Sequence, residues 1–147
     1  MNSDWVVREV DWNARRTELH AIRRAVFIDE QHVPEELEWD EADGRCRHVL
    51  AFSPEGEAVG TGRLLPDGHI GRMAVLKAWR GRGAGSAILN LLLDLAGASG
   101  FDTVRLHAQT HAVGFYAKHG FTVTGDEFME AGIPHRAMTQ RLKPGGQ

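Results

Sequence analysis

The chain has 147 residues, of which 42% are hydrophobic and 25% charged, and its formal net charge is −3. These values predict one globular domain with a buried core and give no support to a nucleic-acid-binding protein that relies on bulk positive charge. The single cysteine, Cys46, cannot form an internal disulfide. No secretory signal pattern and no run of about 18 apolar residues occurs, so we expect a cytoplasmic protein without a membrane span.

The first half of the chain predicts one helix among short strands. We expect this helix to be capped by Asp11 or Asn13 and to run to about Gln31, because apolar residues recur at helical spacing along it. Alternating or apolar runs bounded by Pro and Gly turns predict strands on either side of it. These strands cover residues 5–10, 47–53, 58–65 and 69–75.

The second half predicts two helices and three strands. The helix over 83–98 is rich in leucine, and the strand over 103–109 alternates between apolar and polar side chains. The remaining expected elements are a short helix over 111–119 and strands over 121–124 and 136–142. Residues 143–147 read as a flexible tail.

The order of these elements predicts an α/β domain over residues 5–142. The strand–helix–strand unit over 69–109 is expected to place two parallel neighbours at the centre of the sheet, joined by a right-handed crossover. The other neighbours are expected to be antiparallel. The fold class is therefore a single-domain, mixed and mainly antiparallel sheet with helices on both faces.

A basic, glycine-rich turn between the strand ending at Val75 and the leucine-rich helix is the most informative feature. It points the first N–H groups of that helix, and the positive end of its dipole, at whatever lies over the turn. Glycines allow close approach of the backbone, and Arg80 and Arg82 add positive charge. This arrangement predicts a phosphate or pyrophosphate site.

Two common phosphate motifs do not match this turn. A P-loop requires a Lys after its last glycine, and none follows Gly85. A dinucleotide fingerprint requires G-x-G-x-x-G and an acidic residue at the end of the next strand, where Gln109 stands instead. The pattern from Arg80 to Gly85 does match R-x-x-G-x-G/A, and it resembles the acetyl-CoA loop of the GNAT acetyltransferase superfamily.

A second stretch strengthens the resemblance. The residues from Gln109 to Phe121 are similar to the family pattern N-x-x-A-x-x-F-Y-x-K-x-G-F, with Gln109 in place of the usual Asn. The segments 26–31, 38–43 and 71–75 resemble a bacterial branch of small GNAT proteins of mostly unassigned substrate. The resemblance covers residues 5–142 and implies the fold described above.

The resemblance also implies acetyl-CoA as co-substrate. In the family, backbone amides of the loop hold the pyrophosphate, and the end of the preceding strand pairs with the pantetheine arm, where an N–H can polarise the thioester carbonyl. Carried over to this sequence, the binding residues are Met73, Ala74, Val75, Arg80, Gly81, Arg82, Gly83, Ala84, Gly85, Ser86, Gln109 and Tyr116.

Tyr116 is the candidate general acid, because the matching family tyrosine points at the sulfur and a phenol is protonated at neutral pH. Candidates for the general base come from the segment 29–43, which holds eight acidic residues and no Lys or Arg. We expect this segment to border the acceptor site and attract a cationic amine, with Glu30, Asp40 and Asp43 as candidate bases. A solvated acidic loop is the alternative.

His107 and His135 are rival bases, and so is a water relay. We expect no metal, because His107 and His111 straddle a strand end and a helix start and no H-E-x-x-H pattern occurs. Cys46 lies between Arg45 and Arg47, whose charges lower a thiol pKa, with an inert thiol as the alternative.

Together these features predict an N-acetyltransferase that moves acetyl from acetyl-CoA to a primary amine by direct attack in a ternary complex. The alternatives are another acyl-CoA as donor, or a non-catalytic CoA-binding or regulatory module with the same fold. The expected partner is a small-molecule or peptide amine. The oligomeric state is left open, with a homodimer as one possibility because many members of the family dimerise.

Overall fold

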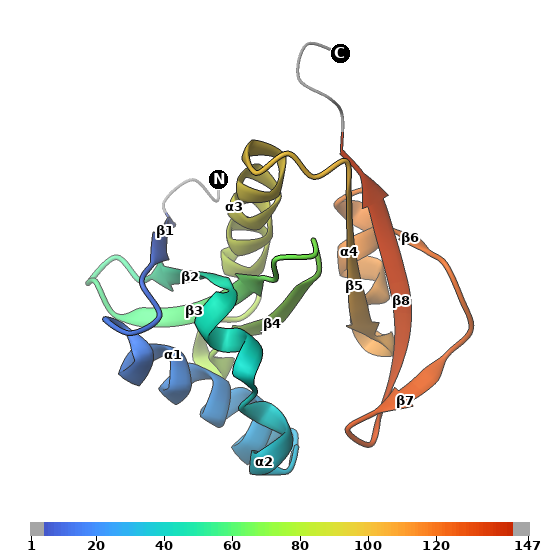
Figure 1. Ribbon diagram of the computed structural model, residues 1–147. Coiled ribbons are helices and arrows are strands. Elements are labelled where there is room, and N and C mark those ends of the chain that lie inside the picture. The colour runs from blue at the N-terminus through green and yellow to red at the C-terminus, as the bar shows by residue number, and fades with distance from the viewer. Residues whose placement is uncertain (1–4, 143–147) are drawn as a thin grey trace.

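A computed structural model describes residues 5–142, so the predicted tail over 143–147 lies outside the described residues. The strands form two sheets that lie side by side (Figure 1). In the first sheet, β1 (Val6–Val10), β2 (Arg47–Phe52), β3 (Ala58–Leu64) and β4 (Ile70–Val75) pair antiparallel in chain order. In the second, β8 (Ile133–Arg141) pairs antiparallel with β5 (Thr103–Gln109), β6 (Thr122–Val123) and β7 (Phe128–Glu130).

Helical segments join these strands. They are α1 (Arg16–Arg23), the π-helix η1 (Arg24–Glu30), α2 (Glu35–Glu38), η2 (Glu41–Arg45), η3 (Lys77–Trp79), α3 (Ala84–Ala98), η4 (Thr110–Ala112) and α4 (Val113–Lys118). Within residues 5–142, none of them has both the length and the apolar character that a membrane crossing needs.

The first sheet is covered on both faces. In β2, Val49 and Ala51 belong to the hydrophobic cluster that includes α3, while Leu50 between them belongs to the cluster that includes α1. Successive side chains of a strand point to opposite faces, so α1 and α3 lie on opposite sides of this sheet, as Figure 1 shows. This two-sided burial explains the continuous apolar run in β2.

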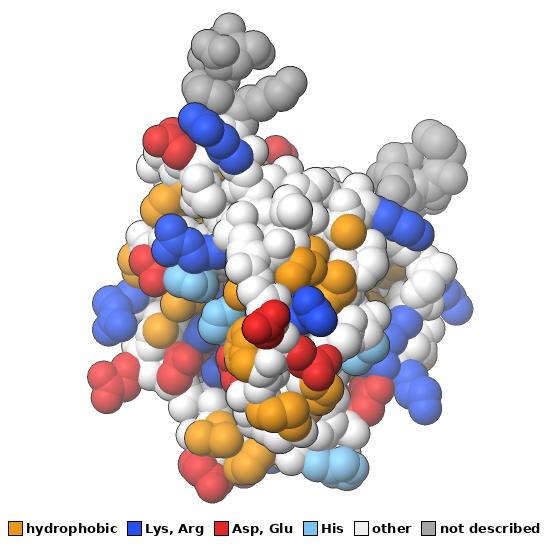
Figure 2. Space-filling model, turned by 90° about the vertical axis from the view of Figure 1, so that its right-hand side faces the viewer, with side chains coloured by type: hydrophobic (Ala, Val, Ile, Leu, Met, Phe, Trp, Pro, Cys, Tyr) orange, Lys and Arg blue, Asp and Glu red, His pale blue; other side chains and the backbone are white. Residues whose placement is uncertain are grey.

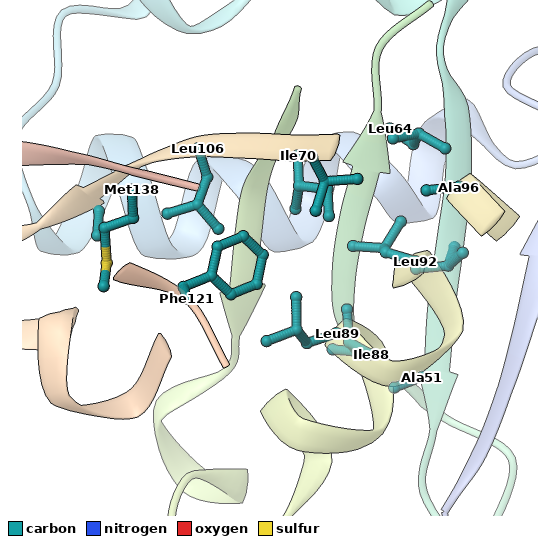
Figure 3. Close-up of a cluster of buried hydrophobic side chains, with 13 residues drawn as sticks. Ala51, Leu64, Ile70, Ile88, Leu89, Leu92, Ala96, Leu106, Phe121 and Met138 are labelled. Carbon is teal, nitrogen blue, oxygen red and sulfur yellow. The ribbon is translucent and has the colours of Figure 1, made fainter. Parts of the chain in front are cut away.

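Close packing of α3 on β3 depends on two glycines. A Cβ atom at Gly60 or Gly62 would lie 2.8 Å from a side-chain carbon of Ile88 or Leu92, respectively, which no unshifted packing allows. The helix therefore approaches the strand more closely than any larger residue would permit. Figure 3 shows Ile88, Leu89 and Leu92 of α3 in one core with Phe121 and Met138 of the second half.

The two sheets meet at one end only. A single parallel bridge joins His69 to Arg105, and β4 and β5 have no further ladder pairing in the part of the chain that the structure describes. In β4 the register with β3 shifts opposite Gly62, and Arg72 adopts a φ of 50°. This bulge bends β4, so the expected parallel neighbours diverge towards their carboxyl ends. The predicted fold class is confirmed, with the central parallel pair reduced to one bridge.

The long first helix departs from expectation. It begins at Arg16, and Asp11 instead accepts a hydrogen bond from the N–H of Ala14 in the preceding turn. From Arg24 the helix widens into π geometry, with the N–H of Gln31 bonded to the carbonyl of Val26. The wider turn keeps Val26 and Phe27 in the core. At its end, Glu30 binds Arg80, and the next residue, Gln31, binds Gln109 of β5.

The hairpin of β7 and β8 was not predicted, and β8 begins at Ile133 rather than Arg136. Its two-residue turn, Ala131 and Gly132, has φ values of 52° and 78°. A turn with two positive φ values suits the twist of a hairpin, but Asn-Gly or Asp-Gly is its usual sequence signal. Ala131 lacks that signal, so the local pattern did not reveal the turn.

Candidate functional site

The amino end of α3 presents backbone donors at the glycine-rich turn. Gly83 is the N-cap, no side chain caps the helix, and the first helical hydrogen bond runs from Ala87 to the carbonyl of Gly83. The N–H groups of Ala84, Gly85 and Ser86 therefore precede the helical ladder. Gly83 has a φ of 92°, a conformation that side chains disfavour. The turn fits an anion such as a phosphate by local geometry.

Two tryptophans hold this turn in place. The indole Nε1 of Trp5 donates to the carbonyl of Arg82 at 2.8 Å, and the Trp5 ring packs edge-on against Trp79 at 5.9 Å. The Arg82 guanidinium lies 5.0 Å from the centre of the Trp79 ring. The segment before β1 therefore supports a loop that is 77 residues away in sequence. Sequence reasoning missed this role of Trp5, because no local pattern signals such a contact.

Arg80 does not turn its charge towards the predicted anion site. Its Nη1 and Nη2 contact the two carboxylate oxygens of Glu30 at 2.5 and 2.6 Å, and its Nε donates to the carbonyl of Val75 at 2.8 Å. The hydrogen bonds from Arg80 lower the pKa of Glu30. A carboxylate held ionised by a bidentate arginine is a weak proton acceptor, so the structure does not favour Glu30 as general base.

Tyr116 lies where β4 and β5 diverge. Its hydroxyl contacts the Sδ atom of Met73 at 3.7 Å, and its ring packs edge-on against Phe115 and Phe121. Burial raises the pKa of Tyr116 to about 12. A thioether is a weak acceptor, so this contact leaves the phenolic proton available to a stronger one. The hydroxyl is therefore a protonated donor next to a residue predicted to contact the pantetheine arm.

Three carboxylates of the acidic segment are neutralised by arginines within the protein. Glu38, Asp40 and Asp43 face three arginines from other elements, Arg23 of α1, Arg63 of β3 and Arg72 of β4. Arg23 donates to Glu38 at 2.8 Å and to Asp43 at 2.8 Å, while Arg63 donates to Asp43 at 2.6 Å. The formal charges of these six side chains sum to zero, and all but Asp40 and Arg72 are buried, so they form a largely buried ionic network rather than an attractive surface for cations.

The pKa values within this network follow from burial and pairing. Hydrogen bonds from Arg63 lower the pKa of Asp40 to about 2. Burial alone would raise the pKa of Asp43, but the bonds from Arg23 and Arg63 outweigh it and lower that pKa. At Glu38 burial dominates and raises the pKa, although the Nε atom of Arg72 lies 3.1 Å from its carboxylate.

The prediction of Asp43 as general base is therefore corrected. Its side chain is 4% exposed, and two guanidinium groups occupy its oxygens, so it neither meets an acceptor amine nor accepts its proton readily. Glu38, Asp40 and Asp43 are paired with arginines and are not free to attract a cation, whereas attraction by the rest of the acidic segment stays a prediction. On the face towards β6–β8, Figure 2 shows acidic, basic, histidine and hydrophobic side chains interspersed. One sequence signal for this pairing was available. The segment 29–43 contains no Lys or Arg, while arginines are in excess elsewhere in the chain.

Histidines outside that network have oriented rings. The Nδ1 atom of His107 lies 2.8 Å from Glu130 Oε1, and that of His69 lies 2.9 Å from Asp67 Oδ1. An ionised carboxylate only accepts, so in each pair Nδ1 carries the proton and the neutral ring keeps a free lone pair at Nε2. His135 is buried, and its Nδ1 donates to the carbonyl of Ile133 at 2.7 Å.

Gln109 connects β5 to the end of η1. Its Nε2 donates to Gln31 Oε1 at 2.9 Å, and its Oε1 lies 2.8 Å from His111 Nε2. Ser86 at the start of α3 is joined to His119 by a contact of 3.0 Å. Contact of Gln109 and the other predicted binding residues with acetyl-CoA stays a prediction. Sequence reasoning missed Gln31, which lies far from Gln109 along the chain.

Two other sequence candidates have structural explanations. Burial raises the pKa of the Cys46 thiol and outweighs the charges of Arg63 and Arg23, which act on it in place of Arg45 and Arg47, so an activated thiolate is not favoured. In the described range 5–142, no three His, Cys, Asp or Glu side chains group closely enough to hold a metal ion.

A hollow of about 230 Å³ lined by residues including Arg45, Arg47 and Phe101 lies by the carboxyl end of α3, away from the glycine-rich turn.

Comparisons with known proteins show the family to which the chain is similar. Residues 12–142 match the family model described as the acetyltransferase (GNAT) domain. The uncharacterised protein YyaT of Bacillus subtilis is 40% identical over 142 residues, covering 92% of this chain and 95% of YyaT. The uncharacterised N-acetyltransferase YjcF of the same organism is 41% identical over 121 residues, covering 80% and 86%. The crystal structure of Escherichia coli ElaA is similar with a TM-score of 0.82 at 29% identity, covering 93% and 99%.

Proposed function

The chain belongs to the GNAT acetyltransferase family, and from this premise we propose that it transfers acetyl from acetyl-CoA to a primary amine by direct attack in a ternary complex. One observation carries the proposal. The uncapped N–H donors of α3 lie next to α4, as the contact of Ser86 with His119 shows, and Tyr116 of α4 directs its hydroxyl to Met73 of β4. The strands β4 and β5 diverge there.

The turn before α3 suits the diphosphate of acetyl-CoA. Amides of Ala84, Gly85 and Ser86 provide hydrogen bonds, and the positive φ of Gly83 brings the backbone close without a Cβ atom. Because Arg80 is held by Glu30, we assign the binding energy mainly to the amides rather than to its guanidinium. When bound, acetyl-CoA supplies an activated thioester.

We assign two groups of this chain to the stabilisation of charge at that thioester. The bulge in β4 takes Met73 out of the ladder with β3, so we assign its N–H as the donor to the carbonyl oxygen. Tyr116 holds a proton at its hydroxyl and donates it to the departing sulfur. The contact between Tyr116 and Met73 keeps these two donors together.

Among the bases left open, His107 fits best. Glu130 fixes its tautomer with Nε2 unprotonated, and its side chain lies on the face of β5 opposite the buried Leu106 and Ala108. An amine approaching from that face would meet Nε2 without crossing the core. A carboxylate that orients an imidazole also stabilises the imidazolium formed when it accepts a proton.

Thiol release from acetyl-CoA, measured with a panel of primary amines, tests the function. We expect release with at least one amine, and acyl-CoA donors of other chain lengths run alongside show whether acetyl is preferred. Calorimetry with coenzyme A provides the binding control. Binding without thiol release from any amine would instead indicate a non-catalytic module.

Substitution of His107 tests the assignment of the base. We expect His107→Gln to lower kcat by about 100-fold, since general bases contribute roughly that much. Glu130→Gln should lower kcat less, because Nε2 remains. The matched variant His135→Gln keeps Nε2 of His107, so a larger loss in that variant would move the base to His135.

A further inference from the structure

Two consecutive residues connect the diverging ends of β4 and β5. On one side, both oxygens of Glu30 hold Arg80, whose Nε bonds the carbonyl of Val75, the last residue of β4. On the other side, Oε1 of Gln31 accepts a hydrogen bond from Gln109, the last residue of β5. Among residues 5–142, one isolated bridge joins the two segments, from His69 just before β4 to Arg105 in β5. The carboxyl ends are thus linked through η1 rather than through each other.

We propose that the pair Glu30 and Gln31, here called the Glu30–Gln31 tie, positions the ends of β4 and β5 for acyl-CoA, with Arg80 as a positioning residue and not a phosphate ligand. This inference rests on the proposed function, because it concerns how the acyl-CoA site is held open. In this proposal the Arg80 side chain, which belongs to the glycine-rich turn, binds groups of the protein itself and not a phosphate of the ligand.

The donor arrangement of Arg80 supports this assignment. A guanidinium has five N–H donors in a planar fork, and Arg80 uses Nε, Nη1 and Nη2 on partners within the chain. The bidentate pair with Glu30 also cancels its charge locally. A phosphate would have to compete with a carboxylate that is already aligned. The π-helical turn of η1 brings Glu30 and Gln31 to these two partners from one short segment.

The two roles of Arg80 predict opposite effects of Glu30→Gln on binding of coenzyme A, measured by calorimetry. If Arg80 binds phosphate, removing the competing carboxylate frees its charge and binding becomes tighter or stays unchanged. If Arg80 belongs to the tie, the substitution loosens the end of β4 and binding weakens. We expect a weakening of about threefold to tenfold, in the range of the net contribution of one ordinary hydrogen bond.

Arg80→Lys provides a second, independent variant. Lysine keeps the positive charge but not the fork that joins Glu30 to Val75, so the tie predicts a loss similar to that of Glu30→Gln. The double variant that combines Glu30→Gln with Arg80→Lys should bind coenzyme A no more weakly than the single variant that binds more weakly. Both changes break the same connection, so their effects should not add. Gln31→Ala, which breaks the other connection, should also weaken binding.

Glu9→Gln is the matched control. Glu9 and Arg47 form a bidentate pair of similar exposure between β1 and β2, at 39% and 40% against 36% and 40% for Glu30 and Arg80. We expect it to leave affinity for coenzyme A unchanged. Wild-type-like or tighter binding by Glu30→Gln, or wild-type-like binding by Arg80→Lys, would overturn the tie. Lack of binding by the wild-type chain would overturn the proposed function itself.

Discussion

The hydroxyl of Tyr116 and the Sδ atom of Met73 lie 3.7 Å apart and join α4 to β4 across 43 positions of sequence. The contact places the phenol beside the strand that the glycine-rich turn follows. Because sulfur accepts hydrogen bonds weakly, the arrangement positions the phenol without engaging its proton strongly. The proposed acid and the proposed binding loop are therefore parts of one local structure.

Replacing Tyr116 with Phe should separate catalysis from binding. The variant keeps the ring that packs between Phe115 and Phe121 but lacks the proton, so kcat should fall about 100-fold or more. Affinity for coenzyme A, measured by calorimetry, should stay within about twofold of wild type. A parallel loss of affinity would assign Tyr116 to packing alone.

The ionisation of Tyr116 can be measured directly, because it is the only tyrosine in the chain. Burial raises its pKa from 10.0 to about 12, so tyrosinate absorbance in the ultraviolet should appear well above pH 10. The same protein in denaturant provides the reference titration. A raised folded-state pKa also means that the stability linked to this group is lost as pH rises from about 10 towards 12. Coincident titration curves would contradict the burial of the hydroxyl.

Two glycines, one at the cap of α3 and one within it, should respond in opposite ways to substitution by Ala. Gly83 has a φ of 92°, so Gly83→Ala should lower the free energy of unfolding by about 1 kcal/mol and weaken binding of coenzyme A. Gly97 is helical, and a methyl group added there would meet no other atom within 4 Å. Gly97→Ala should therefore stabilise the protein by up to about 1 kcal/mol without changing affinity. Urea unfolding and calorimetry measure both effects.

The buried ionic network should be sensitive to the loss of a single charge. Asp43→Asn leaves Arg23 with Glu38 and Arg63 with Asp40, but it leaves one positive charge of the network uncompensated, so we expect a loss of about 3–5 kcal/mol in the free energy of unfolding. Glu18→Gln, which breaks an exposed pair with Arg15, serves as control and should cost less than about 1 kcal/mol. Equal effects in urea unfolding would argue against a buried network.

Acid should destabilise the protein in part through Asp40. Its folded-state pKa of about 2 lies below the ordinary aspartate value of 3.8, so its contribution is complete above about pH 4 and is lost as pH falls from about 4 to about 2. Asp40→Asn removes this contribution, and its stability should depend less steeply on pH in that window. Unfolding in urea at a series of pH values compares the two proteins. Identical slopes would show that the bonds with Arg63 do not shift the pKa of this group.

Local patterns in the sequence were sufficient for the glycine-rich turn, most strands and the family. The turn was predictable because its glycines, its arginines and the start of α3 are neighbours along the chain, and backbone donors depend on local conformation. The β7–β8 hairpin was missed because Ala131 takes a positive φ that its side chain does not signal. Both the glycine-rich turn and the hairpin turn depend on local sequence. Only the hairpin turn lacks its usual signal, because Ala131 stands where Asn or Asp is typical.

Tertiary structure alone decided the roles of the charges. The sequence predicted that Asp43 and Glu30 face an acceptor, but Arg23, Arg63 and Arg80 from three distant segments bind them. Sequence pattern reports which residues can ionise and which lie on one face of an element. Whether a carboxylate is free to accept a proton depends on partners that folding brings from far along the chain, and these partners determine its pKa.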